Sequence, residues 1–558
     1  MKPHWTLLPQ ASGASRIAAQ LGIHPAIASI LLRRGVRTPS EISDFLNPAL
    51  ELLQDPFVFQ DMEKAVRRIR RAVADREKIL VYGDYDVDGV TGSAILCPAL
   101  KRMGADVEAH IPHRIEEGYG LNLGTLARFA EKKLGLVITV DNGITGIEPI
   151  RFLVSKGIDV IIVDHHAPKG EIPPAYAILS AAVGEKKGDP NLAACGVAFK
   201  LAWALLGSLE AVRHTLDLVA LGTVADLAPV RGDNRTLLKH GLPALSRTQR
   251  PGLVALMKVA RISRRHVSYR DIAFGLAPRI NASGRMGSPL HAFELLTTDS
   301  EEAAARLAKF LDEGNRERQR VEAAAFEQAA EEVRTNFADP GENRVLVLHH
   351  SEWHEGVLGI VAARLVERFQ RPSIVIAMKD QIGKGSGRSL PHFSLFDCVL
   401  SCEDLLENFG GHAQACGLTI RGENVEEFRR RINRSALEAD ALGGIPALEI
   451  DGELAPGEID LKFLKDLERL APFGPGNKKP LFLSKGLRMK GPPARRGKDT
   501  LVCWMTDENG QNTCEVVGFR AFGRWNGSPQ NRYDVVHRPS LREFDGIASI
   551  QLELEDWA

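Results

Sequence analysis

The sequence predicts a multidomain α/β protein whose main domain is a mostly parallel, doubly wound sheet. The chain has 558 residues. This length suggests roughly three to four domains, each with its own core. Between about residues 78 and 230, short apolar runs alternate with helical stretches, which is the pattern of parallel strands joined by helices. From about residue 446 the pattern changes to closely spaced apolar runs, which favours a separate small β-barrel.

Composition indicates a globular chain without an overall charge bias. Hydrophobic residues make up 44%, and Lys plus Arg and Asp plus Glu number 71 each. Such a balance gives no global sign of nucleic-acid binding, although a local basic groove would be hidden in the average. The seven cysteines lack zinc-site spacing, and no apolar run approaches the roughly 18 residues of a membrane span. A soluble, cytoplasmic, monomeric protein with reduced thiols and no membrane partner is therefore expected.

The most informative stretch follows the first predicted strand of the main domain, residues 79–82. Three carboxylates stand there at alternate positions: Asp84, Asp86 and Asp88. A helix is expected to begin near Thr91. Alternate residues of an extended segment point to one side, so these carboxylates would repel one another unless a cation lies among them. Oxygen ligands of this kind suit Mg²⁺ or Mn²⁺, although Asp at such places can also be a simple helix cap or turn residue.

More polar residues follow the next predicted strands, 136–140 and 160–163, and a helical region that ends at Ala225. They are Asp141, Asp164, His165, His166 and Asp226. Because open α/β sheets place their ligands at the carboxyl ends of the strands, we expect these side chains to lie near the first cluster. Each one alone could be a turn residue, a cap or a core histidine. Together they supply the ligands of a two-metal hydrolytic site.

These motifs, taken in order, resemble those of the DHH phosphoesterase superfamily and, within it, the RecJ exonuclease family. The segments that carry the resemblance are Gly83–Gly89, Val140–Gly143, Asp164–His166 and Ala225–Asp226. Two further segments, 111–121 and 278–287, also match the family and are expected to present Arg114 and Arg285 from Gly-rich loops. The resemblance covers about residues 50–480. The sequence departs from the family at Ser180, where an Asn-Pro pair is usual, and through 184–190, which puts that loop in doubt.

Residues 290 to about 336 are expected to be helical throughout. The resemblance also implies a domain order. The expected parts are a helical lead-in (1–50), a DHH catalytic domain (51–300), a long connecting helix (301–340), a smaller α/β DHH-associated domain that binds substrate (341–445) and an OB-like barrel that binds single strands (446–558). Gly-rich segments of the substrate-binding domain, among them an expected loop at 385–389, would hold phosphates through small residues and donors. In the barrel, some of four aromatic residues could stack on bases: Trp504, Phe519, Phe522 and Trp525.

The function implied by the resemblance is a metal-dependent exonuclease that degrades single-stranded DNA from the 5′ end and releases mononucleotides in repair and recombination. The implied ligands of two Mn²⁺ or Mg²⁺ ions are Asp86, Asp88, Asp141, His165 and Asp226. Catalytic support would come from Asp84, Asp164 and His166. Substrate phosphates would be held by Arg114, Arg285, Ser386, Arg388, Gly410, Gly411 and His412.

Single-stranded DNA is the partner that the resemblance implies, with a helicase or a single-strand-binding protein working beside the enzyme. Two alternatives stay open at this point. One is a phosphodiesterase of short oligonucleotides or cyclic dinucleotides, for which the extra barrel would be unnecessary. The other is a DNA-binding scaffold that has lost catalysis, which should lack some of the metal carboxylates.

Overall fold

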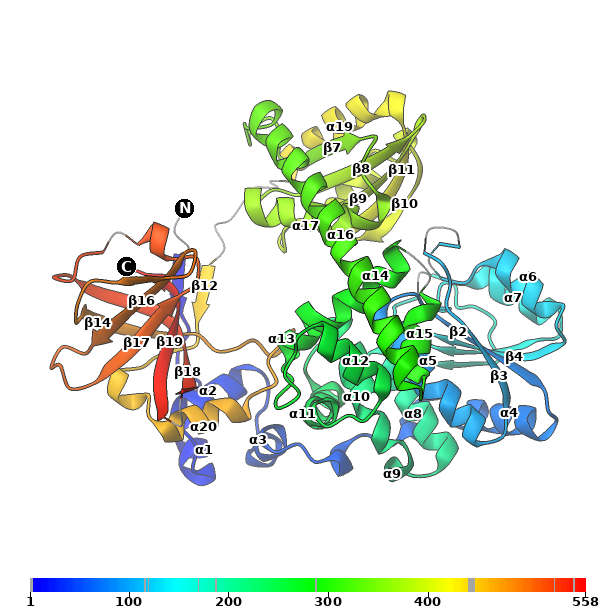
Figure 1. Ribbon diagram of the computed structural model, residues 1–558, viewed down its shortest axis with the longest axis horizontal. Helices are drawn as coiled ribbons and strands as arrows, with labels where there is room; N and C mark the ends of the chain where they lie inside the picture. Colours follow the sequence, from blue (N-terminus) through cyan, green and yellow to red (C-terminus); the bar gives the residue numbers. More distant parts are fainter. Residues whose placement is uncertain are drawn as a thin grey trace. The chain divides into compact units, whose positions relative to one another are not determined.

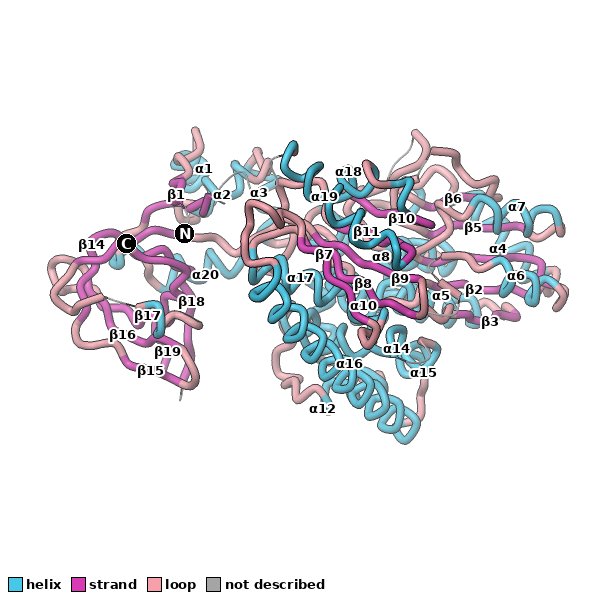
Figure 2. Tube along the Cα trace, turned by 90° about the horizontal axis from the view of Figure 1, so that it is seen from above, coloured by secondary structure: helices cyan, strands magenta, loops and turns pink. Residues whose placement is uncertain are grey.

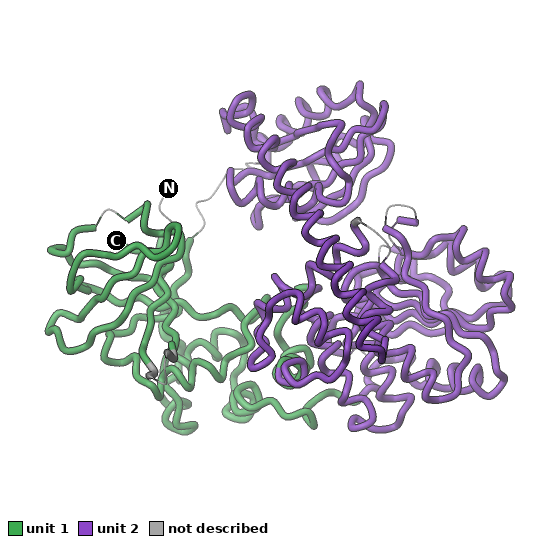
Figure 3. Tube along the Cα trace, in the orientation of Figure 1, with its two compact units in different colours: residues 1–55, 227–242, 445–558 green, residues 56–226, 243–444 purple. Residues whose placement is uncertain are grey.

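The computed structural model describes residues 4–558 apart from 115, 116, 119, 169, 186, 187, 287, 288, 440–446, 526, 545 and 546. The chain divides into two compact units (Figure 3). Unit 1 contains residues 1–55, 227–242 and 445–558, and unit 2 contains 56–226 and 243–444. The N-terminal helices therefore share a unit with the C-terminal strands. The predicted domain boundaries stay predictions, and the one at 445 lies outside the described residues.

Unit 2 contains the predicted parallel sheet. Its strands are β2 (Lys78–Gly83), β3 (Asp106–His110), β4 (Leu134–Val140), β5 (Asp159–Val163) and β6 (Ala177–Leu179). They lie in the order β3-β2-β4-β5-β6, and all neighbouring pairs are parallel. The central strands are apolar on both faces, as expected for a parallel sheet that helices cover on both sides. The predicted doubly wound fold class is confirmed.

Two layers of helices cover this sheet (Figure 1). The helices are α6 (Leu123–Ala130) and α7 (Ile147–Ser155) on one face, and α4 (Met62–Ala74), α5 (Val87–Arg102) and α8 (Ala194–Leu206) on the other. On the first face, Leu126 and Ile150 pack against Leu80 and Ile162 of the strands. Burial of each such side chain contributes about 1.5–3 kcal/mol, so both layers hold the strand ends firmly in place.

Helix α5 begins at Val87, so the predicted start near Thr91 is wrong. Asp86 caps the helix, because its Oδ1 accepts hydrogen bonds from the backbone N–H groups of Asp88 (2.9 Å) and Gly89 (3.3 Å). Such a cap satisfies N–H groups that would otherwise lack a partner in the first turn. Asp86 and Asp88 therefore do not belong to one extended segment, and helix geometry rather than alternation brings them together.

The part of unit 2 between the parallel sheet and residue 336 is helical. Its helices are α9 (Leu209–Val212), α10 (Leu216–Ala225), the end of α11 (Gly232–Ser246), α12 (Pro251–Val259), α13 (Tyr269–Asp271), α14 (Ala277–Met286), α15 (Leu290–Thr297) and α16 (Glu301–Asn336). Figure 2 shows α16 as one uninterrupted helix. The prediction of continuous helix from residue 290 is wrong, because the chain breaks at Thr298 and Ser300 caps α16 by accepting from the N–H of Ala303.

A second, five-stranded sheet follows α16 in unit 2. Its strands are β7 (Leu346–His350), β8 (Ser373–Lys379), β9 (Ile382–Arg388), β10 (Leu406–His412) and β11 (Ala415–Arg421), and its helices are α17 (Leu358–Phe369), α18 (Leu395–Leu400) and α19 (Val425–Glu438). The strand order is β10-β11-β9-β8-β7. The prediction of a loop at 385–389 is wrong, because β9 pairs with both β8 and β11.

Unit 1 is built around a seven-stranded barrel. Its strands are β13 (Gly452–Glu453), β14 (Phe482–Met489), β15 (Ala494–Arg496), β16 (Thr500–Thr506), β17 (Thr513–Gly518), β18 (Arg532–Phe544) and β19 (Ile547–Trp557), in the order β13-β14-β18-β19-β17-β16-β15 with an added β14–β16 pairing. The predicted OB-like barrel is confirmed. Strands β15 and β18 and the helix α20 (Leu461–Arg469) escaped prediction. Trp504 and Phe519 are exposed, whereas Phe522 and Trp525 pack against the core.

The N-terminal helices complete the core of unit 1. They are α1 (Ala14–Leu21), α2 (Pro25–Arg33) and α3 (Pro39–Leu46), and a short parallel pair joins β1 (His4–Leu7) to β12 (Ala447–Ile450). Ile27 and Leu31 share one core with Phe463 and Phe482 of the C-terminal part. Within the described residues, no single helix is long and apolar enough to cross a membrane; α1 and α2 pass such a test only as a pair bent by 119°.

Candidate active site

Three aspartates continue the hydrogen-bond ladder of the parallel sheet by one residue. Asp84, Asp141 and Asp164 each donate a backbone N–H to the last carbonyl of the neighbouring strand, over 3.0, 2.9 and 3.2 Å. Asp141 adopts φ +64°, which lies in the left-handed region that is strained for a non-glycine residue. Because the strands end in register, the three carboxylates come together at the carboxyl edge of the sheet.

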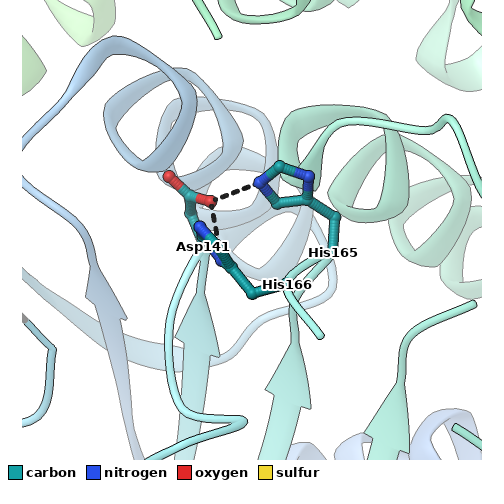
Figure 4. Close-up of side chains that lie close together, drawn as sticks. All are labelled: Asp141, His165 and His166. Atoms are coloured by element: carbon teal, nitrogen blue, oxygen red, sulfur yellow. Dashed lines mark ion pairs between the residues drawn. The ribbon is translucent and has the colours of Figure 1, made fainter. Parts of the chain in front are cut away.

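The predicted carboxylates and histidines form one cluster. Their ligand atoms make three overlapping groups within 4.8 Å: Asp84, Asp86 and Asp141; Asp88, His165 and Asp226; and Asp141, His165 and His166. Figure 4 shows the third group, in which His165 Nε2 lies 3.2 Å and His166 Nδ1 3.8 Å from Asp141 Oδ1. Asp141 and His165 each belong to two groups. Of these two, only the Asp141 carboxylate, with two oxygens, could serve two neighbouring cations, because a neutral imidazole offers one acceptor nitrogen.

The cluster has the chemistry that a divalent cation requires. Asp84 Oδ1, Asp141 Oδ1 and His165 Nε2 are buried, and none has a hydrogen-bond partner in the described part of the chain. Burial, and then the negative charge of Asp86, raise the pKa of Asp84 and of Asp141 well above the usual range for a carboxyl. Buried polar atoms are rarely left unpaired. Carboxylate oxygens and imidazole nitrogens fit Mn²⁺ or Mg²⁺, and a cation here would remove this repulsion.

Asp88 is held in place by the start of helix α8. Its Oδ2 accepts from the N–H of Ala194 (2.7 Å), and its Oδ1 accepts from the N–H of Cys195 (2.9 Å). The positive end of the helix dipole favours the carboxylate there. Burial nevertheless raises the pKa of Asp88. The sequence did not predict these two donors, because they are backbone N–H groups and every residue except proline has one.

Asp164 orients both histidines. Its Oδ1 accepts from the N–H groups of His165 (2.8 Å) and His166 (3.1 Å) and lies 2.7 Å from His166 Nδ1, while its Oδ2 accepts from the N–H of Ile144. Burial alone would raise the pKa of Asp164, but the hydrogen bond from His166 lowers it. Burial alone would lower the pKa of His166, but Asp164 raises it to about 9. The pair therefore favours a carboxylate beside an imidazolium.

A second part of the candidate site is basic. Arg114, Ser386 and Gly410 line a cavity of about 560 Å³, together with ten residues from the segments 355–358, 384–385, 408–409 and 417–419. Arg388 Nη1 donates to Ser386 Oγ (3.3 Å), which places this guanidinium beside the cavity. Of the seven predicted phosphate-binding residues, three therefore line the cavity directly and one lies against its wall.

Arg285 belongs to helix α14, so its predicted place on a Gly-rich loop is wrong. Its Nη1 donates to the carbonyl of Gly356 (2.9 Å), which lines the cavity. Burial, and then the positive charges of Arg114, Arg318 and Arg388, lower the pKa of Arg285 to about 10. Guanidinium groups gathered without matching carboxylates favour a bound anion, and a phosphate can bridge them by bidentate hydrogen bonds.

Gly410 and Gly411 of the β10–β11 hairpin are needed for different reasons. A Cβ on Gly411 would lie 2.3 Å from the carbonyl oxygen of Ala415, and its φ of +145° is one that L-residues rarely adopt. A Cβ on Gly410 would meet no atom within 4 Å. The fold requires Gly411, whereas Gly410 keeps space open in the cavity. His412 is exposed, and among the described residues no hydrogen bond or ion pair joins it to the carboxylate cluster.

Tyr85 and Asn281 also shape the site and were not predicted individually. The Arg114 guanidinium lies 5.1 Å from the centre of the Tyr85 ring, and Asn281 Oδ1 accepts from the N–H of Val87 at the start of α5 (3.2 Å). Asn281 stands inside the segment 278–287 that carries the family resemblance, so a signal for it existed. Residues 115, 116, 119 and 287 of the two arginine segments, and Lys186 and Lys187 of the divergent loop, lie outside the described residues.

Comparison with known proteins accounts for both sheets and the barrel. The sequence matches the models of the DHH family, N-terminal domain, over residues 78–223, of the DHHA1 domain over 342–438 and of the RecJ OB domain over 450–556. It is 36% identical to the single-stranded-DNA-specific exonuclease RecJ of Bacillus subtilis strain 168, over 100% of this chain and 71% of that protein. It is 33% identical to the Escherichia coli K12 protein of the same name, over 95% of both chains.

The fold is similar to that of the crystal structure of RecJ in complex with Mn²⁺ from Thermus thermophilus, with a TM-score of 0.85 and 30% sequence identity. That match covers 100% of this chain and 79% of the other. A second structure of the Thermus protein, in complex with Mg²⁺, matches with a TM-score of 0.77. With whole-chain identity above 30% to several RecJ exonucleases and a matching architecture, this chain belongs to the RecJ family of DHH phosphoesterases.

Proposed function

We propose that this protein is a metal-dependent exonuclease that hydrolyses single-stranded DNA from its 5′ end and releases mononucleotides. The observation that carries the proposal is the presence, within unit 2, of both a buried carboxylate and imidazole cluster and a cavity that Arg114 lines and that Arg285 and Arg388 adjoin. The relatives named above act on single-stranded DNA, and two solved relatives hold Mn²⁺ or Mg²⁺. Hydrolysis of a phosphodiester uses both a cation cluster and a phosphate-binding surface.

In this proposal, the metal-binding side chains are Asp86, Asp88, Asp141, His165 and Asp226. Bound cations would supply positive charge to the attacking and leaving oxygens of the scissile phosphate. Asp84 Oδ1 has no hydrogen-bond partner among the described residues, and its carboxylate would add a negative charge to the same cluster. Asp164 fixes the ring of His166, whose pKa of about 9 keeps it protonated at neutral pH. A protonated ring beside the cluster would donate a hydrogen bond to the phosphate as negative charge develops on it.

The guanidinium groups would determine which end of the strand enters. Arg114, Arg285 and Arg388, with Ser386, would hold a terminal phosphate by charge-assisted hydrogen bonds. A strand end that carries such a phosphate is the 5′ end, which supports the proposed polarity. The open space at Gly410 would accommodate the terminal nucleotide, and His412 at the end of the hairpin would contact the same nucleotide.

The experiment that tests the proposal is digestion of a long single-stranded DNA labelled at either end, with Mn²⁺ or with a chelator. We expect metal-dependent early release of the 5′ label as a mononucleotide, with 5′-phosphorylated strands cut faster than 5′-hydroxyl strands. Asp141→Ala should abolish turnover. Early release of the 3′ label would overturn the polarity. Turnover of dinucleotides alone would instead indicate a phosphodiesterase of short oligonucleotides, and binding without turnover would indicate a scaffold.

A cytoplasmic location, a monomeric state and work beside a helicase and a single-strand-binding protein belong to the same proposal. All seven cysteines are free and buried, which is compatible with a reducing compartment. Co-purification of the tagged protein from a native host would test the partners, and sedimentation would test the monomeric state.

A further inference from the structure

One surface segment of unit 2 is strongly basic although the chain as a whole is neutral. No Asp or Glu occurs from residue 234 through residue 270, where about five would be expected from the average over the whole chain. Within unit 2 this stretch contains seven Lys and Arg residues, and six of them define what we call the basic strip: Arg247, Lys258, Arg261, Arg264, Arg265 and Arg270. A surface that only keeps a protein soluble usually mixes both signs of charge, and this segment does not.

The charges of the basic strip are exposed and uncompensated. All six side chains are exposed to solvent, and in the described part of the chain none of them forms an ion pair. The neighbouring Arg250 does pair, with the buried Asp217, so it is not included. Phe274, at the end of the strip, is 77% exposed, and the Arg270 guanidinium lies 5.9 Å from the centre of its ring.

The backbone of the strip is well anchored. Val267 is buried and donates its N–H to Ser246 Oγ (2.9 Å), while Arg264 Nη2 donates to the carbonyl of Thr248 (2.6 Å). A Cβ on Gly275 would lie 2.6 Å from the side chain of Ile262, so the turn after α13 packs closely against the strip. The strip therefore presents its charges from a fixed surface.

Two connections place the strip near the candidate active site. The segment Ile272–Leu276, which follows Arg270 closely, packs against α10, the helix that ends directly before Asp226. The chain then continues into α14, which runs from Ala277 to Arg285 of the basic cavity. Eight residues of helix span about 12 Å. The end of the strip at Arg270 thus lies toward the Asp226 side of the carboxylate cluster, about one short helix away from Arg285.

We propose that the basic strip binds the sugar-phosphate backbone of the single-stranded DNA substrate on the 3′ side of the scissile bond. This inference rests on the proposed function. Lys and Arg neutralise phosphates without reading sequence, as a processive nuclease needs. The exposed ring of Phe274 offers a stacking surface for a base that is not paired, which favours a single strand over a duplex. The enzyme would thereby hold its substrate on the catalytic unit itself, in addition to any contact with the barrel.

The test compares two triple variants on two substrates. The strip variant is Lys258→Glu/Arg265→Glu/Arg270→Glu, and the matched control is Arg70→Glu/Lys101→Glu/Lys156→Glu, on exposed positions of α4, the end of α5 and the cap of α7. Each changes the net charge equally. The substrates are a hexanucleotide, which should fit the cavity and metal cluster, and a strand of several dozen nucleotides.

We expect the strip variant to raise KM for the long strand about tenfold or more at low salt, with kcat unchanged. The slope of log KM against log salt concentration should fall by about 2, because three phosphate contacts are lost. KM for the hexanucleotide should not change. Phe274→Ala, which cannot disturb a core, should raise KM for the long strand about fivefold. The control variant should behave as the wild type on both substrates.

Several results would overturn the proposal. Equal KM values and salt slopes for the strip and control variants on the long strand would exclude it. A defect confined to a duplex with a single-stranded tail would assign the strip to double-stranded DNA instead. If the wild type cuts no strand at all, the proposed function fails. In that case, fluorescence anisotropy of the labelled long strand still decides whether the strip binds it, and unchanged affinity of the strip variant would refute the inference.

Discussion

Gly222→Ala tests how closely the fold around the metal cluster is packed. Gly222 lies on α10 and is fully surrounded by α5 and α8. An added Cβ would lie 2.3 Å from Thr91 Oγ1, 2.6 Å from Cys195 Sγ and 3.0 Å from Asp88 Oδ1. Ordinary contacts are about 3.4 Å or longer. None of these atoms can retreat freely, because Thr91 Oγ1 donates to the carbonyl of Val87 and Asp88 holds the start of α8.

The helices must therefore move apart by roughly an ångström, and such overpacking costs about 1–3 kcal/mol of unfolding free energy. Asp226 follows α10 directly and lies 3.9 Å from His165 Nδ1, so the shift is transmitted to a proposed ligand. A displacement of about 1 Å in a catalytic constellation can cost about 100-fold in rate. We expect Gly222→Ala to lose at least that factor in kcat and a few degrees in melting temperature.

The assay is Mn²⁺-dependent digestion of single-stranded DNA, with circular dichroism to measure thermal unfolding. Gly314→Ala is the matched control, because this glycine is also inside a helix but a Cβ there would meet no atom within 4 Å. That control should keep full activity and gain about 0.5–1 kcal/mol of stability. Adding Thr91→Ala to Gly222→Ala removes the nearest obstacle and should restore part of the rate. Wild-type kcat in Gly222→Ala alone would refute the reasoning.

Three further predictions follow from the same geometry. In chelator, the urea concentration at the midpoint of unfolding should fall as the pH rises from 6.5 to 9. The reason is that the pKa of His166 is raised to about 9 and that of Asp226 to about 8, so the folded chain binds these protons more tightly than the unfolded chain. Mn²⁺ should reduce this fall, and a midpoint independent of pH would contradict the prediction. Gly410→Ala should raise KM several-fold without changing the melting temperature; unchanged KM would mean that the substrate does not use this space. Arg68→Met should lower the unfolding free energy by about 2–4 kcal/mol, since the buried guanidinium pairs with Glu77 and Asp159, and urea titration with Arg67→Met as an exposed control would measure it.

The positions of three candidate-site aspartates could be predicted because parallel strands have a simple geometry. Apolar runs such as 136–140 identify strands, and the residue after a strand must lie at the carboxyl edge. That rule brought Asp84, Asp141 and Asp164 together from sequence alone, and the ladder hydrogen bonds agree with it. The prediction that Asp86 and Asp88 alternate along an extended segment is wrong. Asp86 instead caps α5, because its side chain accepts hydrogen bonds from N–H groups of the first turn that would otherwise have no partner.

The errors in the second sheet have a different cause. Strand β9 reads Ile-Gly-Lys-Gly-Ser-Gly-Arg, and glycine has a low intrinsic preference for strands. Its pairing with β8 and β11 outweighs that preference, and a Cβ on Gly385 would lie 2.8 Å from Leu418 of the neighbouring strand. Strand β18 was missed because its Arg and Pro residues break any apolar alternation. Such strands form because they pair with segments that are distant in the sequence, and a local sequence pattern does not predict this pairing.

The candidate site combines two clusters that are each unfavourable in the folded chain alone. Carboxyl groups gathered around Asp141 have raised pKa values because burial and mutual repulsion disfavour their charged forms. Burial, and then the neighbouring guanidinium groups, likewise disfavour the charged form of Arg285 and so lower its pKa. A divalent cation would relieve the first strain and a phosphate the second. Because a strand end bound at the guanidinium groups brings its next phosphate toward the cations, each ligand should strengthen the binding of the other. A protein that only binds DNA would have no use for the carboxylate cluster, because its negative charge repels the phosphates.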